Sequence, residues 1–251
     1  MISFLIMKFS RFKIQNLNLL IIKNLIDGDA MNLEHHIHLL MLGDSVFDNG
    51  VYVPGEPDVS AQVKSHLERS FKSSKLTFHA RDGAVMSDVK NQQIKNIPEG
   101  ITHIALSIGG NDLLGLIQYL DQNRGDSFHQ NLQFLSQLKQ KFSEEYTEVI
   151  QTIDTLGIPF SVCTIYYAGP IEESGAKRVD VKGDVGLSGT DVVVDAFDSA
   201  IIEIANKAQN CKDIIDLRWL FDAPDCYANP IEPSCIGGER IAKRVISNLK
   251  S

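Results

Sequence analysis

The sequence predicts one α/β domain in which a parallel β-sheet carries helices on both faces. Short apolar runs typical of buried strands alternate about five times with segments of helical period, and this alternation favours a parallel sheet. The chain has 251 residues, of which 43% are hydrophobic and 22% are charged, and no long linker rich in proline or serine divides it. These values are ordinary for a soluble globular protein, so we expect a single domain.

Five short apolar segments are expected to be strands. The first, residues 37–42, ends abruptly at Gly43-Asp44-Ser45, and such a turn signal is typical of the end of a buried strand. The third, residues 101–108, runs into Gly109-Gly110-Asn111-Asp112. The remaining strands are expected at residues 75–79, 159–164 and 213–217.

The segments between the strands have apolar residues at helical spacing and polar residues that can cap a helix. Asp58 and Ser60 can cap the first helix, Ser87 can cap the second, and Gly157 ends the longest one. The expected helices span about residues 58–70, 87–97, 113–119, 127–156, 192–208 and 236–249. Residues 169–190 are rich in glycine and charge without a clear period, so we expect a long loop near the site.

The first thirty residues differ from residues 31–251, which we expect to form the domain. They are densely apolar, but charged side chains break every apolar run well short of the ~18 residues that a membrane-spanning helix needs. Their longest uninterrupted apolar run is also too short for the centre of a secretory signal. We expect residues 1–30 to be a weakly ordered extension, an amphipathic helix at a membrane surface, or the product of a mis-assigned start, with Met31 as the true one.

Several classes of protein are disfavoured by composition and motif. The net charge of −8 argues against a nucleic-acid partner, because such a partner favours a basic face. The cysteines form no C-x-x-C pair, and none is grouped with histidines at a zinc spacing. The sequence contains no G-x-G-x-x-G after the first strand, no G-x-x-x-x-G-K-[ST] and no H-E-x-x-H. We therefore expect no metal, no cofactor, a small-molecule substrate and a cytoplasmic location.

Ser45, Gly83 and Asn111 each follow a predicted strand. Right-handed crossovers bring the carboxyl ends of parallel strands to one edge of the sheet, so these three residues should converge there. Ser45 is a candidate nucleophile. The Ser45 N–H, the Gly83 N–H and the Asn111 side-chain amide could donate hydrogen bonds to the oxyanion of an acyl-transfer intermediate. Each residue alone also fits a plain turn or a helix cap, but the ordered set of three is much less expected by chance.

In the short motifs around Ser45, Gly83 and Asn111, the chain resembles the GDSL lipase/esterase group, the SGNH hydrolases. The resemblance extends from the first strand onward. Gly43-Asp44-Ser45 matches the first block of that family, Gly83 the second, and Gly109-Gly110-Asn111-Asp112 the third. The resemblance implies a three-layer α/β/α sandwich of flavodoxin-like type. It also implies a nucleophilic serine, an oxyanion hole made by the three blocks, and hydrolysis of esters of lipids or acetylated sugars, or of thioesters.

The fourth block is where the sequence departs from the family pattern. The family normally has Asp-x-x-His-Pro there, whereas this chain has Asn229 in place of the aspartate and Glu232 in place of the histidine. The other histidines do not obviously compensate, because they lie in helices or in and before predicted strands: His35, His36, His38, His66, His79, His103 and His129.

Glu232 allows two hypotheses. A carboxylate is ionised at neutral pH and can accept a hydrogen bond from Ser45, but it is a weaker base than imidazole unless burial, or a neighbouring acid such as Asp225, raises its pKa. In the first hypothesis Glu232 is the general base of a serine esterase. In the second, catalysis is impaired and the pocket only binds an acyl or glycan ligand. Because Ser45, Gly83 and Asn111 are present, the sequence favours the first hypothesis.

Overall fold

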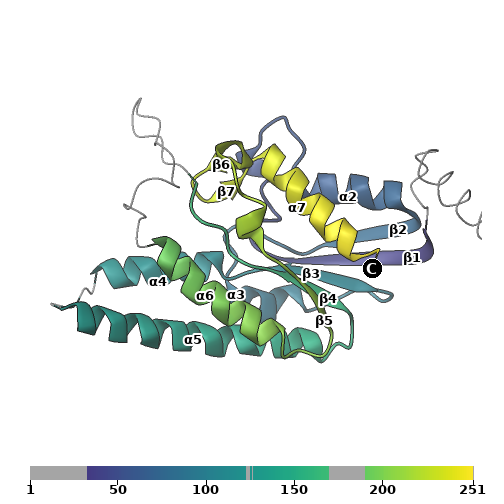
Figure 1. The fold of residues 1–251 in the computed structure, drawn as a ribbon. Coiled ribbons are helices and arrows are strands. Elements are labelled where there is room, and N and C mark those ends of the chain that lie inside the picture. The colour runs from purple at the N-terminus through teal and green to yellow at the C-terminus, as the bar shows by residue number, and fades with distance from the viewer. Residues whose placement is uncertain (1–32, 123–124, 126, 170–189, 251) are drawn as a thin grey trace, which may run out of the picture.

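The sheet has five parallel strands in the computed structural model, which describes residues 33–122, 125, 127–169 and 190–250 (Figure 1). The strands are β1 (Leu33–Gly43), β2 (Phe71–Phe78), β3 (His103–Ser107), β4 (Phe160–Cys163) and β5 (Cys211–Ile215). Their order is β2-β1-β3-β4-β5, so the predicted fold class and the five predicted strands are confirmed. The predictions for residues 1–30, and for all but the two ends of the loop at 169–190, lie outside the described residues.

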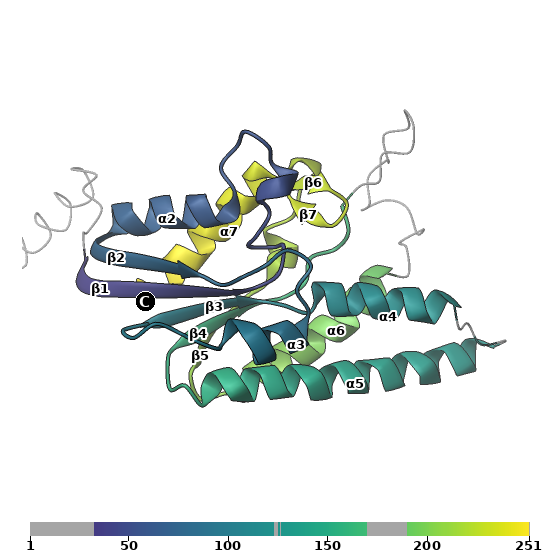
Figure 2. The ribbon, with the colours of Figure 1, turned by 180° about the vertical axis from the view of Figure 1, so that it is seen from behind.

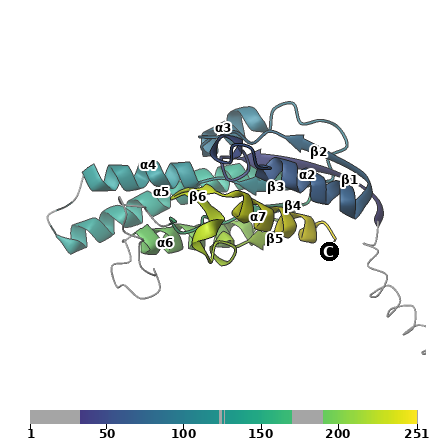
Figure 3. The ribbon, with the colours of Figure 1, turned by 90° about the horizontal axis from the view of Figure 1, so that it is seen from above.

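Helices cover both faces of the sheet (Figure 1 and Figure 2). On one face lie α2 (Val59–Ser70) and α7 (Cys235–Asn248), and on the other lie α3 (Met86–Asp88), α4 (Gly110–Gln122), α5 (Phe128–Asp154) and α6 (Thr190–Ala205). Figure 3 shows that α4 and the adjoining part of α5 extend past the end of the sheet. The arrangement is the predicted three-layer sandwich. In the described part of the chain, every helix is too short or too polar to cross a membrane.

Alternate residues of β1 face the two helical layers. Leu40 and Leu42 belong to the core that α4, α5 and α6 cover, whereas Leu39 and Met41 belong to the core that α2 and α7 cover. All four side chains are completely buried. A strand that is buried on both faces needs a continuous apolar run, and this is why the strand lacks the polar alternation of a half-exposed one.

Three predicted helix boundaries are confirmed by local contacts. The Asp58 carboxylate accepts the Ala61 N–H at 2.7 Å where α2 begins, and the Ser127 hydroxyl accepts the Gln130 N–H at 3.2 Å where α5 begins. Gly157, shortly after α5, has a φ of +68°. This is the left-handed conformation in which glycine commonly ends a helix.

The helix predicted to begin at Ser87 is shorter and is capped differently. It begins at Met86, with Val85 in the cap position, and a single π-helical turn, Val89–Gln93, continues it. The Met86 N–H donates to the Asp112 carboxylate at 3.1 Å. A carboxylate 26 residues away in the sequence therefore accepts the first N–H of this helix. The prediction that the Ser87 hydroxyl caps it is therefore wrong.

Two further differences change the surroundings of the site. Helix α4 begins at Gly110 and not at Leu113, which places Asn111 in its first turn. A small antiparallel hairpin, β6 (Tyr227–Asn229) and β7 (Glu232–Pro233), was not predicted, because strands this short show no periodicity. The hairpin lies outside the main sheet, near the carboxyl ends of its strands and on the side of α2 and α7 (Figure 1, Figure 2).

Candidate active site

Ser45 follows β1 through a turn that the main chain fixes. Gly43 has a φ of +138°, and a Cβ atom there would lie 1.8 Å from the Ser107 carbonyl oxygen on β3, so only glycine fits. The Asp44 N–H donates to the same oxygen at 3.0 Å, and the Asp44 Oδ1 accepts the Val46 N–H at 3.1 Å. The predicted turn therefore holds Ser45 at the carboxyl end of β1, as expected from the sequence.

Gln93 is a second support of this turn that was not predicted from the sequence. Its buried side-chain amide forms two hydrogen bonds with Gly43, accepting the Gly43 N–H at 2.7 Å and donating to the Gly43 carbonyl at 2.8 Å. Gln93 comes from the π-helical turn that follows α3. Fifty residues separate the two, and no local pattern in the sequence marks a glutamine for such a contact.

A cavity of about 110 Å³ lies beside Ser45, and three of the four predicted site residues line it: Ser45, Asn111 and Glu232. The segments that follow β1, β3 and β4 contribute to its wall, as do α4, α6 and the hairpin. Most of the rest of the lining is apolar and includes Leu113, Leu114, Ile117, Ile165 and Val194. The predicted convergence of Ser45 and Asn111 at this edge of the sheet agrees with the geometry.

Glu232 lies on β7 with its side chain almost completely buried. Ser45 lines the same cavity, and its hydroxyl lies close enough to the carboxylate to favour the ionised form. The buried Oε2 atom of Glu232 has no hydrogen-bond partner within the described residues. One oxygen of this carboxylate therefore remains able to accept a hydrogen bond.

Burial raises the pKa of Glu232 to about 7, the nearby Ser45 hydroxyl opposes the rise, and the negative charge of Asp82 adds to it. The prediction that Asp225 is the neighbouring acid that raises this pKa is wrong. The acid whose negative charge raises the pKa of Glu232 is Asp82, which lies in the segment after β2. A carboxylate with a pKa near 7 is a stronger base than an exposed glutamate.

Asn111 and Gly83 occupy neighbouring positions with different exposure. The Asn111 side-chain amide donates one hydrogen bond to the Ala84 carbonyl at 2.9 Å, which leaves its second N–H for another acceptor. Gly83 is exposed, has a φ of +75°, and does not line the cavity beside Ser45. It lines a separate polar hollow with Asp82. The Arg81 N–H donates to the Gly43 carbonyl at 3.0 Å, so the Gly83 loop is tied to the Ser45 turn.

A second buried carboxyl, that of Asp44, lies directly before the serine. Burial raises its pKa to about 8, and the charges of Glu232 and Asp112 act in the same direction. The Val46 N–H opposes the rise. At neutral pH this carboxyl therefore holds its proton and adds no negative charge beside Ser45. The sequence suggested only that Asp44 shapes the turn.

No histidine of the described chain lines the cavity that holds Ser45. His66 pairs with Glu239 at 2.9 Å, and His79 contacts the Gln93 carbonyl at 2.7 Å. His38 and His103 bond to threonine hydroxyls. The expectation that other histidines do not replace the missing one therefore holds for these residues.

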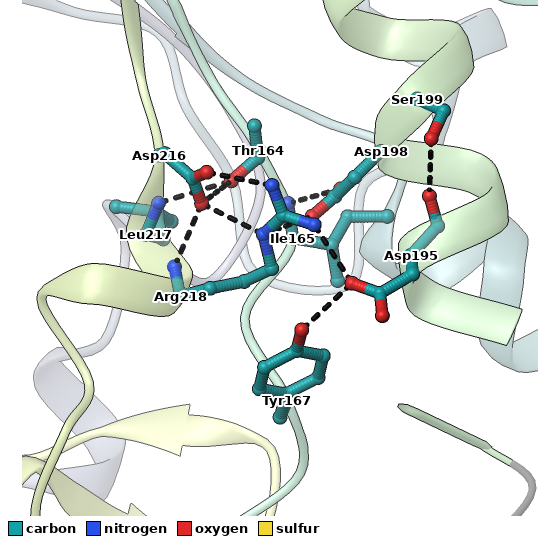
Figure 4. Close-up of polar contacts among 9 residues, drawn as sticks. All are labelled: Thr164, Ile165, Tyr167, Asp195, Asp198, Ser199, Asp216, Leu217 and Arg218. Atoms are coloured by element: carbon teal, nitrogen blue, oxygen red, sulfur yellow. Dashed lines mark hydrogen bonds and ion pairs between the residues drawn. The ribbon is translucent and has the colours of Figure 1, made fainter. Parts of the chain in front are cut away.

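Behind the cavity wall, one arginine contacts three carboxylates (Figure 4). Arg218 lies 2.8 Å from Asp195, 3.2 Å from Asp198 and 2.6 Å from Asp216. Asp198 is completely buried and accepts the N–H of Ile165, a lining residue, at 2.9 Å. Burial raises the pKa of Asp198 to about 7, against the effects of this N–H and of Arg218. The network joins α6 to the ends of β4 and β5 and supports the wall.

No family model matches the sequence, and no curated protein matches it. Several solved structures, however, match this chain. An extracellular lipase from Streptomyces rimosus superposes with a TM-score of 0.61 at 18% identity, covering 84% of this chain and 99% of that one. A phospholipase A1 from Streptomyces albidoflavus gives 0.57 at 16% identity, with 86% and 100% covered. The acetylxylan esterase Axe2 from Geobacillus stearothermophilus gives 0.59 at 16% identity, with 88% and 97% covered.

These similarities establish the fold. The chain has the three-layer α/β architecture of lipases and acetylxylan esterases of known structure, over nearly the full length of those proteins. The expected resemblance to SGNH-type hydrolases is thereby supported at the level of architecture. At this level of identity, function has to be argued from the residues of the site itself.

Proposed function

We propose that this protein is a serine esterase that cleaves carboxylic esters, with Ser45 as nucleophile and Glu232 as general base. The observation that carries the proposal is that Ser45, the buried Glu232 carboxylate and Asn111 line one cavity. A nucleophile, a base within reach of its proton and an amide donor are the parts that acyl transfer requires. The ester-cleaving enzymes with the same architecture support this assignment.

The proposed reaction has two steps, acylation of Ser45 and hydrolysis of the acyl-serine, and Glu232 accepts and returns one proton in each. Glu232 takes the Ser45 proton while the serine oxygen attacks the ester carbonyl carbon, and the collapse of the intermediate returns this proton to the leaving alcohol. A water molecule then attacks the acyl-serine, giving its proton through Glu232 to the Ser45 oxygen as the carboxylic acid leaves. The Ser45 N–H, the Gly83 N–H and the free N–H of Asn111 are the proposed oxyanion donors.

The cavity favours the acyl part of the ester and limits its size. Its walls are mainly apolar, and such walls bind hydrocarbon in preference to hydroxyl groups. A volume of about 110 Å³ is smaller than the roughly 150 Å³ that can enclose a benzene molecule. We therefore propose a short acyl group, with the alcohol part of the substrate outside the cavity.

A binding protein on the same fold is the alternative function. It is favoured by one observation, the replacement of the family histidine by Glu232 in a cavity that no described histidine lines. In that case the cavity would hold an acyl or glycan ligand without turnover.

Hydrolysis of p-nitrophenyl acetate and p-nitrophenyl butyrate by the full chain, beside Ser45→Ala, separates the two functions. We expect turnover of both esters in the parent protein and a loss of about 10³-fold or more in the variant, because the variant lacks the nucleophile. Equal thermal melting of the two proteins is the control for folding. Turnover that survives in Ser45→Ala would contradict the proposal, and a folded parent protein that binds these acyl groups without hydrolysis would favour the alternative.

A further inference from the structure

The main-chain carbonyls on both sides of Glu232 are held by side chains from elsewhere in the fold. The Tyr166 hydroxyl donates to the Ile231 carbonyl at 2.6 Å, and the Asn49 side-chain amide donates to the Pro233 carbonyl at 2.9 Å. Tyr166 belongs to the segment after β4, and Asn49 belongs to the segment after β1. The residue that carries the proposed base is therefore fixed from two directions.

Asn49 is itself immobilised. Its side chain is completely buried, and its Oδ1 accepts the Val59 N–H at 2.9 Å where α2 begins. One amide thus connects the chain after Ser45, the first turn of α2 and the carbonyl next to Glu232. Both ends of the amide are in use, so the group has a single orientation that satisfies its partners.

Tyr166 is fixed by aromatic packing. Its ring stacks on Phe221 with the centroids 4.2 Å apart and the planes 8° from parallel, and Tyr227 meets it edge-on at 5.8 Å. The side chain is 7% exposed. The packing of the ring therefore fixes the Tyr166 hydroxyl in place beside the Ile231 carbonyl.

The hairpin needs such support because its own hydrogen bonds are few. β6 has three residues and β7 has two, and the pair does not join the five-stranded sheet. An isolated two-stranded hairpin is marginally stable in water. A general base, however, must stay within hydrogen-bonding reach of the proton it abstracts.

We propose that Asn49 and Tyr166 are positioning residues that clamp the main chain around Glu232 and so hold its carboxylate against Ser45. This inference rests on the proposed function. The clamp acts on the geometry of proton transfer, so its loss should lower kcat and leave KM nearly unchanged.

Tyr166→Phe is the first test, because it removes only the hydroxyl and keeps the ring stack. With p-nitrophenyl butyrate we expect kcat to fall about tenfold and KM to change less than twofold. Tyr167→Phe is the matched control. It removes the hydroxyl of the adjacent tyrosine, which donates to Asp195 at 2.7 Å and does not contact the hairpin carbonyls, so its kcat should stay within twofold of the parent.

A double-mutant cycle separates positioning from general weakening of the fold. If Tyr166 acts through Glu232, Tyr166→Phe should have less than a twofold further effect in the Glu232→Gln background, whereas independent effects would multiply. Asn49→Ser, which is too short to bridge both partners, should show the same dependence. Thermal melting of each variant checks that the domain remains folded.

The outcomes distinguish the clamp from the proposed function. Activity that needs Ser45 and Glu232 but is unchanged in Tyr166→Phe and Asn49→Ser would overturn the clamp alone. Equal losses in the parent and Glu232→Gln backgrounds would also overturn it. Activity that does not need Ser45 would overturn the proposed function, and the clamp with it.

Discussion

Ser45 follows an eleven-residue strand of the five-stranded sheet, whereas Glu232 lies on a two-residue strand outside that sheet, and yet the two line one cavity. The main chain before Ser45 pairs with two neighbouring strands, so its position follows from the sheet itself. The main chain around Glu232 depends on bonds from two side chains. The Ser45 side of the site should therefore tolerate side-chain changes that the Glu232 side does not, with Gly43 and Gln93 as the exceptions.

Gly43→Ala should produce the largest effect on the nucleophile side. The new Cβ atom would lie 1.8 Å from the Ser107 carbonyl, and the φ of +138° is unfavourable for any other residue. We expect the free energy of unfolding to fall by about 3 kcal/mol or more, measured by urea denaturation. A variant as stable as the parent protein would show that the end of β1 is less constrained than its contacts indicate.

Glu232→Gln should have the next largest effect, on turnover and not on folding. We expect kcat to fall about 10²–10⁴-fold, because the amide cannot accept the Ser45 proton, while the melting temperature stays the same or rises. Burial raises the pKa of this carboxyl, so the fold favours its neutral form, and a neutral amide satisfies that preference.

The pH profile of kcat/KM is the companion measurement for Glu232. The base works only when it is deprotonated, so activity should rise with pH up to about 7 and level off above it, as the pKa of Glu232 requires. Asp44 and Asp82 also face this group, and the Asp44 carboxyl, with a pKa of about 8, would add a second step at higher pH. A profile that falls as pH rises through 7 would argue against Glu232 as the base.

Gly83→Ala should have the smallest effect and sharpens the comparison with Gly43. A Cβ atom on Gly83 meets nothing within 4 Å, so only its φ of +75° opposes the change, at a cost of about 1–2 kcal/mol. The main-chain N–H stays in place, and turnover of p-nitrophenyl acetate should remain within a few fold of the parent protein. A loss of stability as large as that of Gly43→Ala would contradict this difference.

The sheet, its helices and the approach of Ser45 to Asn111 could be predicted because they depend on local patterns. Apolar runs and turn residues mark the strand ends, and parallel topology brings those ends together. The prediction for Glu232 came from its place in a motif, and its burial beside Ser45 agrees with that prediction. Whether Glu232 is a base stays a prediction that the variants above test.

The supports of the site could not be predicted. Gln93, Asn49 and Tyr166 act through side-chain bonds to main-chain atoms between 50 and 184 residues away, and nothing in their neighbouring sequence specifies such partners. The same holds for Ser87, which has the local features of a helix cap and loses that position because Asp112 reaches the Met86 N–H. Partners of polar side chains are fixed by tertiary structure, which a local pattern does not contain.

The bond between Asn49 and Pro233 also has a consequence for folding. It joins positions 184 residues apart, and closing a loop of this length costs more conformational entropy than forming a local contact. During synthesis the chain contains Ser45 well before it contains Glu232. The hairpin has to dock on both anchors before Glu232 lies at the cavity beside Ser45. Recovery of the proposed ester cleavage during refolding should therefore follow hairpin docking and lag behind the formation of the sheet.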